Sequence, residues 1–327
     1  MPDKLRRKLI LAGAALAAAP LSRAGAQAAG YANKAIKIMA AAPPGGLIDV
    51  YARLFAEQFT ARFNQPAVVD NRPGASGIIA TEAMLKSPAD GYTLLVTTTG
   101  MLWQTRVLFR KLPFDLAKDI APITVFPSGP IVIAVQEKTG VKNLKELVDY
   151  VNKNPTTMGS YAVAAYPHVF AETLNKESAN KIETIQYKGE APMWIDMGSG
   201  ALTMAVGTYG PFATVRDKGI RPIAVNGRYR SPKLPDVPTL IEQGMKAPIA
   251  RLEGGIALSA NSAVPAEILD LLAKVAVEGN ETPRAKSMRE NFAIPEMTKG
   301  RADAQRMWRE DAAAWIKEVE ALGVKLD

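Results

Sequence analysis

The chain has 327 residues, of which 48% are apolar and 22% are charged, with a formal net charge of +8, one histidine and no cysteine. This length exceeds what one hydrophobic core usually supports, so we expect a globular protein with two lobes. The missing cysteines exclude disulfides and thiolate metal sites, and a single histidine excludes a histidine-rich zinc site. Because no dense Lys/Arg run alternates with aromatic residues, nucleic acid is not an expected partner.

The first 28 residues have the pattern of a secretory signal peptide. They show a basic start, a short apolar run and two possible cleavage sites, namely Lys4, Arg6, Arg7 and Lys8, then Leu9 to Ala19, then Ala26 or Ala28. The arginine pair leaves the twin-arginine export route open beside the general one. No later apolar run reaches 18 residues, so we expect a periplasmic protein without a membrane-spanning helix.

The first half of the remaining chain alternates strand and helix signals. We predict strands and helices in the order strand 35–41, helix 50–59, strand 66–70, helix 78–86 and strand 92–96. This βαβαβ order indicates a parallel sheet flanked by helices.

A second α/β unit follows, and the chain then returns to the first. The predicted elements are strand 131–135, helix 144–152, a strand ending at 160, helix 167–175, strand 182–187, helix 190–198, strand 201–206, helix 212–218 and strand 220–225. After an exposed loop at 228–237 come strand 256–258 and helices 265–279, 283–291 and 301–322.

The most informative segment is Pro43-Pro44-Gly45-Gly46, which lies between an apolar strand and an amphipathic helix. A tight glycine turn there directs free backbone N–H groups, at the positive end of a helix dipole, beyond the end of the strand. Such a turn holds an anion, although the sequence fits neither a P-loop nor a GxGxxG turn.

Further motifs follow this turn in a fixed order. They are Asp49, Val69-Asp70-Asn71-Arg72-Pro73-Gly74-Ala75, Asp90-Gly91-Tyr92-Thr93-Leu94-Leu95, Tyr187-Lys188-Gly189 and Leu234-Pro235-Asp236-Val237-Pro238-Thr239. The series closely resembles the Bug (TctC-like) family, the extracytoplasmic solute receptors of tripartite tricarboxylate transporters. The resemblance covers nearly the whole chain after the signal peptide.

The resemblance implies a type II periplasmic binding protein fold, with two α/β lobes and a ligand cleft between them. Residues 29–128 and 252–327 then form the first lobe, and residues 129–251 form the second. It also implies capture of a small organic carboxylate for membrane transporter subunits or a sensor. We expect a monomer with no catalytic activity, no cofactor and no metal.

The resemblance also implies which residues bind the ligand. In the first lobe the loops after the first and third strands supply Pro44, Gly45, Gly46, Asp49, Thr98 and Thr99. In the second lobe the candidates are Ser160, Tyr161, Ala165, His168, Thr208 and Tyr209. Because an acid is an odd partner for a carboxylate, we expect Asp49 to fix its loop. His168 is either a structural cap or a ligand contact, and Asn71 and Arg72 are expected to brace a loop away from the cleft.

The loop at residues 160–168, which we call the second-lobe loop, departs from the family pattern. Alanines stand at two glycine places, Ala162 and Ala164, and Ala165 stands at a hydroxyl place, while Tyr161 and Tyr166 add aromatic bulk. A more apolar wall predicts an aromatic or medium-chain carboxylate rather than citrate or aspartate. Of the four tryptophans, we expect only Trp103 to lie near a cleft loop.

Two other classes of protein remain as alternatives. An exported α/β hydrolase acting on carboxylic esters is disfavoured because the chain lacks a GxSxG motif. A surface-adhesion protein is disfavoured by the predicted cleft loops.

Overall fold

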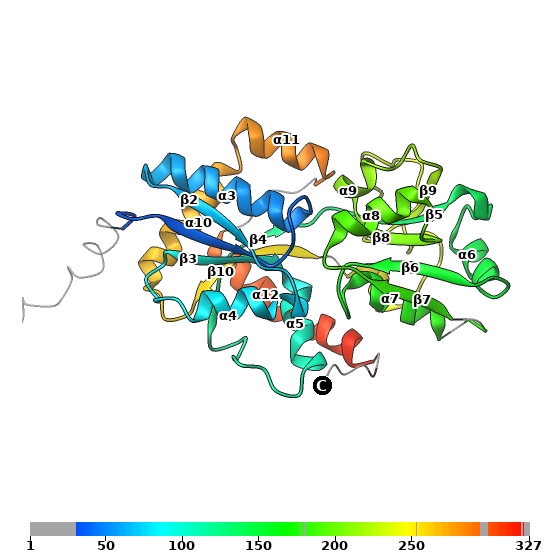
Figure 1. Cartoon of the computed structure of the whole chain (residues 1–327), viewed down its shortest axis with the longest axis horizontal. Coiled ribbons are helices and arrows are strands. Elements are labelled where there is room, and N and C mark those ends of the chain that lie inside the picture. The colour runs from blue at the N-terminus through cyan, green and yellow to red at the C-terminus, as the bar shows by residue number, and fades with distance from the viewer. Residues whose placement is uncertain are drawn as a thin grey trace, which may run out of the picture.

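In the computed structural model, residues 31–176, 178–179, 181–252, 254–294, 300–321 and 323 are described, and they form two α/β lobes side by side (Figure 1). The expected signal peptide lies outside these residues. Each lobe is built on a five-stranded sheet, with strand order β2-β1-β3-β10-β4 in lobe 1 and β7-β6-β8-β5-β9 in lobe 2.

The strands are β1 (Ile36–Ala40), β2 (Ala67–Asn71), β3 (Thr93–Thr98), β4 (Ile120–Pro127), β5 (Ile131–Gln136), β6 (Thr156–Ser160), β7 (Ile182–Gln186), β8 (Met204–Thr208), β9 (Ile220–Val225) and β10 (Gly255–Asn261). The helices are α3 (Leu47–Phe63), α4 (Ile78–Leu85), α5 (Thr99–Leu108), α6 (Leu144–Val151), α7 (Tyr166–Asn175), α8 (Glu190–Ser199), α9 (Tyr209–Ala213), α10 (Ala266–Gly279), α11 (Pro283–Asn291) and α12 (Arg301–Glu320).

The predicted parallel βαβαβ unit is confirmed, because β1 pairs in parallel with both β2 and β3. The strand that returns late in the chain, β10, lies antiparallel between β3 and β4. In lobe 2, β6 is parallel to β7 and β8, whereas β5 is antiparallel to β8 and β9. Among the described residues, no helix is both long enough and apolar enough to cross a bilayer.

Two segments carry the chain between the lobes, and they are tied together. Ser128 donates to the carbonyl of Gly254 through its backbone N–H at 3.2 Å and through its hydroxyl at 2.8 Å. The Asn226 side chain accepts from the N–H of Ile131 at 2.7 Å and donates to the carbonyl of Leu252 at 2.8 Å. The crossing therefore has a defined geometry at the base of the space between the lobes.

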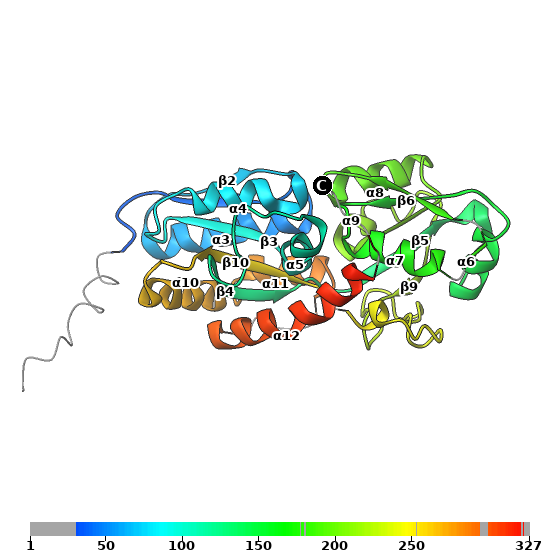
Figure 2. The same ribbon diagram turned by 90° about the horizontal axis from the view of Figure 1, so that it is seen from below.

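Helix α12 adds a third connection between the lobes. It packs against α5 and β4 of lobe 1, and its C-terminal half reaches α7 of lobe 2 (Figure 2). There Trp315 packs edge-on against Tyr166 with ring centroids 6.3 Å apart, and Lys176 Nζ donates to the carbonyl of Ala321 at 3.2 Å.

Three local predictions were wrong or incomplete. Helix α5 was missed because the threonine run before it favours a strand, yet the Thr98 hydroxyl accepts from Met101 N and starts the helix with no intervening loop. Strand β4 was missed because it contains Pro122 and Pro127, which are tolerated because β4 is an edge strand. The short helix predicted at 212–218 lies at α9, directly after β8.

Candidate functional site between the lobes

A cavity of about 340 Å³ lies between the lobes. Its wall in lobe 1 and the crossing segments consists of Ala41, Ala42, Gly46, Leu47, Ile48, Gly74, Ala75, Ser76, Thr98, Gly100, Met101, Gln104, Ser128, Gly254 and Trp315. Its wall in lobe 2 consists of Ile131, Tyr161, Ala162, Val163, Ala165, Tyr166, Gln186, Tyr187, Lys188, Gly189, Glu190 and Thr208. The volume is in the range of small-molecule sites.

The anion-binding end of the cavity is the start of α3. Gly46 is the N-cap residue and no side chain caps it, while Gly46, Leu47 and Ile48 all line the cavity. The first amides of a helix have no partner within the helix and lie at the positive end of its dipole. This end of the cavity is therefore suited to a carboxylate.

Asp49 braces this turn from behind and does not line the cavity. Its carboxylate accepts from Gly45 N at 3.1 Å, from Arg53 Nε at 3.0 Å and from Asn71 Nδ2 at 2.9 Å. Burial raises the pKa of Asp49, but the hydrogen bonds from Arg53, Asn71 and Gly45 outweigh it and leave the pKa below its usual value. The exposed Pro44 and Gly45 lie outside the wall, and the N–H of Gly45 is already used.

The turn after β2 also lines the cavity, which the sequence did not predict. Four consecutive residues there have positive φ, namely Gly74 (118°), Ala75 (45°), Ser76 (49°) and Gly77 (87°). For alanine and serine this conformation costs about 1–2 kcal/mol each. Strained backbone of this kind is concentrated at functional sites. Asn71, just before the turn, is a brace as expected, but it braces the cleft loop and not a loop away from it, because its amide also donates at 2.9 Å to the carbonyl of Ala42, which lines the cavity.

Helix α5 contributes two polar side chains to the wall. The Thr98 oxygen accepts from Met101 N, so its hydroxyl proton remains available to a ligand. Gln104 was not predicted; it is fully buried, lines the cavity, and neither atom of its amide has a hydrogen-bond partner among the described residues. Thr99 faces away, and its hydroxyl oxygen accepts from Gly255 N at 3.3 Å.

In lobe 2, three of the predicted site residues line the cavity and three do not. Those in the wall are Tyr161, Ala165 and Thr208, and those outside it are Ser160, His168 and Tyr209. Tyr209 is buried against Phe212, with ring centroids 6.0 Å apart.

Ser160 and His168 shape the second-lobe loop from beneath. The Ser160 hydroxyl donates to Ala162 O at 2.8 Å, and His168 Nδ1 accepts from Ala164 N at 2.8 Å. Burial lowers the pKa of His168, which keeps the ring neutral and able to accept. In this geometry His168 has the contacts of a structural cap.

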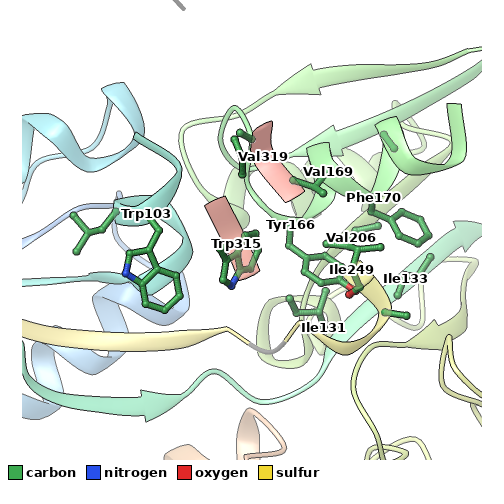
Figure 3. Close-up of a cluster of buried hydrophobic side chains, with 14 of the residues drawn as sticks. Trp103, Ile131, Ile133, Tyr166, Val169, Phe170, Val206, Ile249, Trp315 and Val319 are labelled. Carbon is green, nitrogen blue, oxygen red and sulfur yellow. The ribbon is translucent and has the colours of Figure 1, made fainter. Parts of the chain in front are cut away.

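Two wall residues that we did not predict come from helices far apart in sequence. Glu190 is the first residue of α8 and accepts from the backbone N–H of Thr208 at 3.1 Å and from the Thr208 hydroxyl. Trp315 of α12 lies between Trp103 and Tyr166 (Figure 3). The expectation that only Trp103 lies near a cleft loop was wrong, because Trp315 lines the cavity, whereas Trp103 packs edge-on against Trp308.

The family model of the tripartite tricarboxylate transporter family receptor, TctC, matches residues 51–324. The chain belongs to this family. A UPF0065 protein of Bordetella bronchiseptica is 29% identical over 98% of this chain and 94% of its own length. The structure of R. palustris Rpa4515 with adipate is 26% identical, with a TM-score of 0.81, and covers 90% of this chain and 100% of its own. The periplasmic binding protein BugD is 22% identical, with a TM-score of 0.80, and covers the same shares.

These findings confirm the predicted family and the two-lobed periplasmic binding protein fold. TctC proteins are solute receptors of the periplasm and not enzymes, so the alternative of an exported hydrolase is excluded. Within the described residues, no group of three or more His, Cys, Asp or Glu side chains is placed to hold a metal ion.

Proposed function

We propose that this TctC protein captures a small organic carboxylate in the cavity between its lobes and delivers it to a tripartite tricarboxylate-type transporter. The observation that carries the proposal is the uncapped N-terminus of α3, whose Gly46, Leu47 and Ile48 line the cavity. A 26%-identical relative of known structure, Rpa4515, holds adipate, which is a dicarboxylate.

We also propose the bounds of the two lobes and the compartment in which the protein acts. Lobe 1 would comprise residues 29–128 and 252–327, and lobe 2 residues 129–251. Cleavage near Ala26 or Ala28 would release a periplasmic monomer. A membrane sensor is the other partner that the same ligand-bound receptor would suit.

Apolar side chains dominate the wall beyond the anion-binding end. Leu47, Ile48, Met101, Ile131 and Val163 line it, together with the aromatic rings of the two lobes. Such a wall favours an aromatic or medium-chain carboxylate over citrate or aspartate, because a densely polar ligand would lose hydration there without replacement hydrogen bonds. The buried amide of Gln104 offers one place where a ligand group gains hydrogen bonds.

Thermal unfolding with a ligand panel tests this proposal. Benzoate, phthalate and adipate are compared with citrate and aspartate. A ligand at about 100 times its dissociation constant stabilises the folded state by roughly 2.7 kcal/mol, which a melting curve detects. We expect at least one aromatic or medium-chain acid to raise the melting temperature. If no carboxylate shifts it, the proposed function is wrong; if citrate or aspartate alone shifts it, the interpretation of the apolar wall is wrong.

A further inference from the structure

Glu190 is fixed at the cavity wall by the residues beneath it. Both of its oxygens accept hydrogen bonds from Thr208, one from the backbone N–H and one from the hydroxyl. A Cβ atom at Gly207 would lie 3.3 Å from Glu190 Oε1 and 2.8 Å from Trp194 Nε1, so only glycine leaves room for this arrangement. The position of the carboxyl group therefore comes from the packing of α8 on β8.

The hydrogen-bonding capacity of Glu190 is only partly used. An ionised carboxylate accepts about four hydrogen bonds, and Thr208 supplies two of them. A ligand group that reaches this carboxylate is favoured if it donates a hydrogen bond. A second carboxylate there would meet a like charge inside a largely apolar cavity, where such repulsion is strong.

The uncapped start of α8 favours an anion, but the charged side chains around Glu190 offer little to offset that repulsion. Among the described residues of the wall, the charged ones are Lys188 and Glu190, and the side chain of Lys188 is exposed, where solvent screens its charge. Tyr161 of the second-lobe loop is uncharged, because burial and the nearby Glu190 both raise its pKa.

Burial and the hydrogen bonds from Thr208 are the influences that set the pKa of Glu190, and no cation of the described residues is among them. The next acid of α8, Asp196, accepts a hydrogen bond from the Tyr187 hydroxyl at 2.7 Å. Across the cleft, the turn of lobe 1 approaches α8, since a Cβ at Gly45 would lie 3.6 Å from that of Ala191. The charged group behind this turn is Asp49, which is bound by Arg53.

We propose that Glu190 determines the specificity of this receptor for the second polar group of its ligand. The preferred ligand is a monocarboxylate whose other end carries a neutral hydrogen-bond donor, such as a primary amide or a hydroxyl, rather than a dicarboxylate dianion. The ligand carboxylate lies at the start of α3 and the donor lies at Glu190. The inference rests on the proposed function and adds the chemistry of the second end.

The proposal predicts how affinity depends on pH. Burial raises the pKa of Glu190 to about 7, against which the hydrogen bonds from Thr208 act. About nine-tenths of the group is then protonated at pH 6 and about one-tenth at pH 8. Protonated Glu190 donates to a ligand carboxylate, so a dicarboxylate that requires this form loses up to about tenfold in affinity over that range. A ligand with an amide end has no such requirement.

Calorimetric titration of adipate and its monoamide, adipamate, at pH 6 and pH 8 is the test. The two probes match in length and differ only in the far group. We expect adipamate to bind at least about tenfold more tightly than adipate at pH 8, and the gap to narrow at pH 6. Glu190→Gln keeps the shape of the side chain and an acceptor for Thr208. It should abolish the pH dependence of adipate binding and raise the affinity of the protein for adipate at pH 8. Glu183→Gln changes an exposed acid on β7 and is the control, which should alter neither the affinity for adipate nor its pH dependence.

The outcomes separate this inference from the proposed function. Equal affinities for the two probes at pH 8, or a pH dependence that survives in Glu190→Gln, would overturn the role of Glu190 while leaving carboxylate binding intact. Binding by neither probe nor any acid of the thermal panel would overturn both. In the comparison of Glu190→Gln with the unmodified protein the ligand is the same, so protonation of the ligand itself cancels.

Discussion

The two walls of the cavity differ in their charged groups. In lobe 1 the uncapped start of α3 meets the cavity beside the hydroxyl of Thr98 and the amide of Gln104, and none of the described wall residues there is charged. In lobe 2 the wall includes the charged side chains of Lys188 and Glu190. Backbone groups cannot be exchanged by substitution, whereas side chains can. Lobe 1 is therefore suited to the group that all ligands of the family share, and lobe 2 to the group that distinguishes them.

Removing a backbone donor should have the largest effect on binding. Gly46→Pro deletes one N–H at the start of α3, and Gly46 has φ of −89°, which is near the range of proline. A hydrogen bond to a charged group contributes about 1.5–3 kcal/mol, so the affinity for the ligand found by thermal screening should fall at least tenfold. Calorimetry measures this, and circular dichroism checks that the variant is folded.

Gly46→Ala is the matched control. No atom lies within 4 Å of the added Cβ, and the N–H remains. Its affinity should therefore fall much less than that of Gly46→Pro. A folded Gly46→Pro variant with normal affinity would remove the carboxylate from the start of α3 and would end the division of roles between the lobes.

The strained alanines allow a comparison of the two lobes on stability alone. Ala75 in lobe 1 and Ala164 in lobe 2 have φ of 45° and 55°, a conformation in which glycine avoids the Cβ penalty of about 1–2 kcal/mol. After the entropic cost of glycine, Ala75→Gly and Ala164→Gly should be neutral or stabilising by up to about 1 kcal/mol. Chemical denaturation gives these free energies of unfolding.

Ala313→Gly provides the reference, because it makes the same change at an exposed position inside α12. There the cost should be about 1 kcal/mol. If all three substitutions destabilise the protein equally, the left-handed turns store no strain.

The pH dependence of stability gives a further comparison, because Glu190 and His168 act on it in opposite directions. The pKa of Glu190 is raised in the folded state, so its contribution is present at low pH and is lost as the pH rises through about 7. The pKa of His168 is lowered from 6.5, so its contribution is present above pH 6.5 and is lost as the pH falls below that value.

The chain has one histidine, which makes the two contributions separable. Between pH 5 and 7.5, urea unfolding of Glu190→Gln should show stability that rises with pH. His168→Gln should show stability that falls with pH. Parallel pH profiles in the two variants would contradict both assignments.

The contrast between the two walls of the cavity also explains how much of the site the sequence could predict. The start of α3 is marked by local signals, glycines and prolines between an apolar strand and an amphipathic helix, and these were sufficient to place Gly46 in the site. The turn 74–77 carries comparable glycine signals, but its distance from the cavity depends on sheet order. Glu190 directly follows the motif Tyr187-Lys188-Gly189, yet only the packing of α8 on β8 brings it to the wall.

Other residues of the site have no local signal at all. Gln104 lies inside a helix that the threonine run concealed, and Trp315 is one of several bulky residues on α12. Their arrival at the cavity depends on how α5 and α12 pack together. Asp49, in contrast, was predicted to fix its loop because its charge is unsuited to a carboxylate ligand, and its three hydrogen bonds agree with that role.

The position of β10 also constrains the order in which the molecule can assemble during synthesis. All five strands of the lobe 2 sheet come from one uninterrupted stretch, 131–225. The lobe 1 sheet needs β10 between β3 and β4, so β4 has no neighbouring strand until residue 261 has been made. The lobe that begins first along the chain is thus the one that is completed last. The sheet that carries the anion-binding turn stays incomplete until all of lobe 2 has been synthesised.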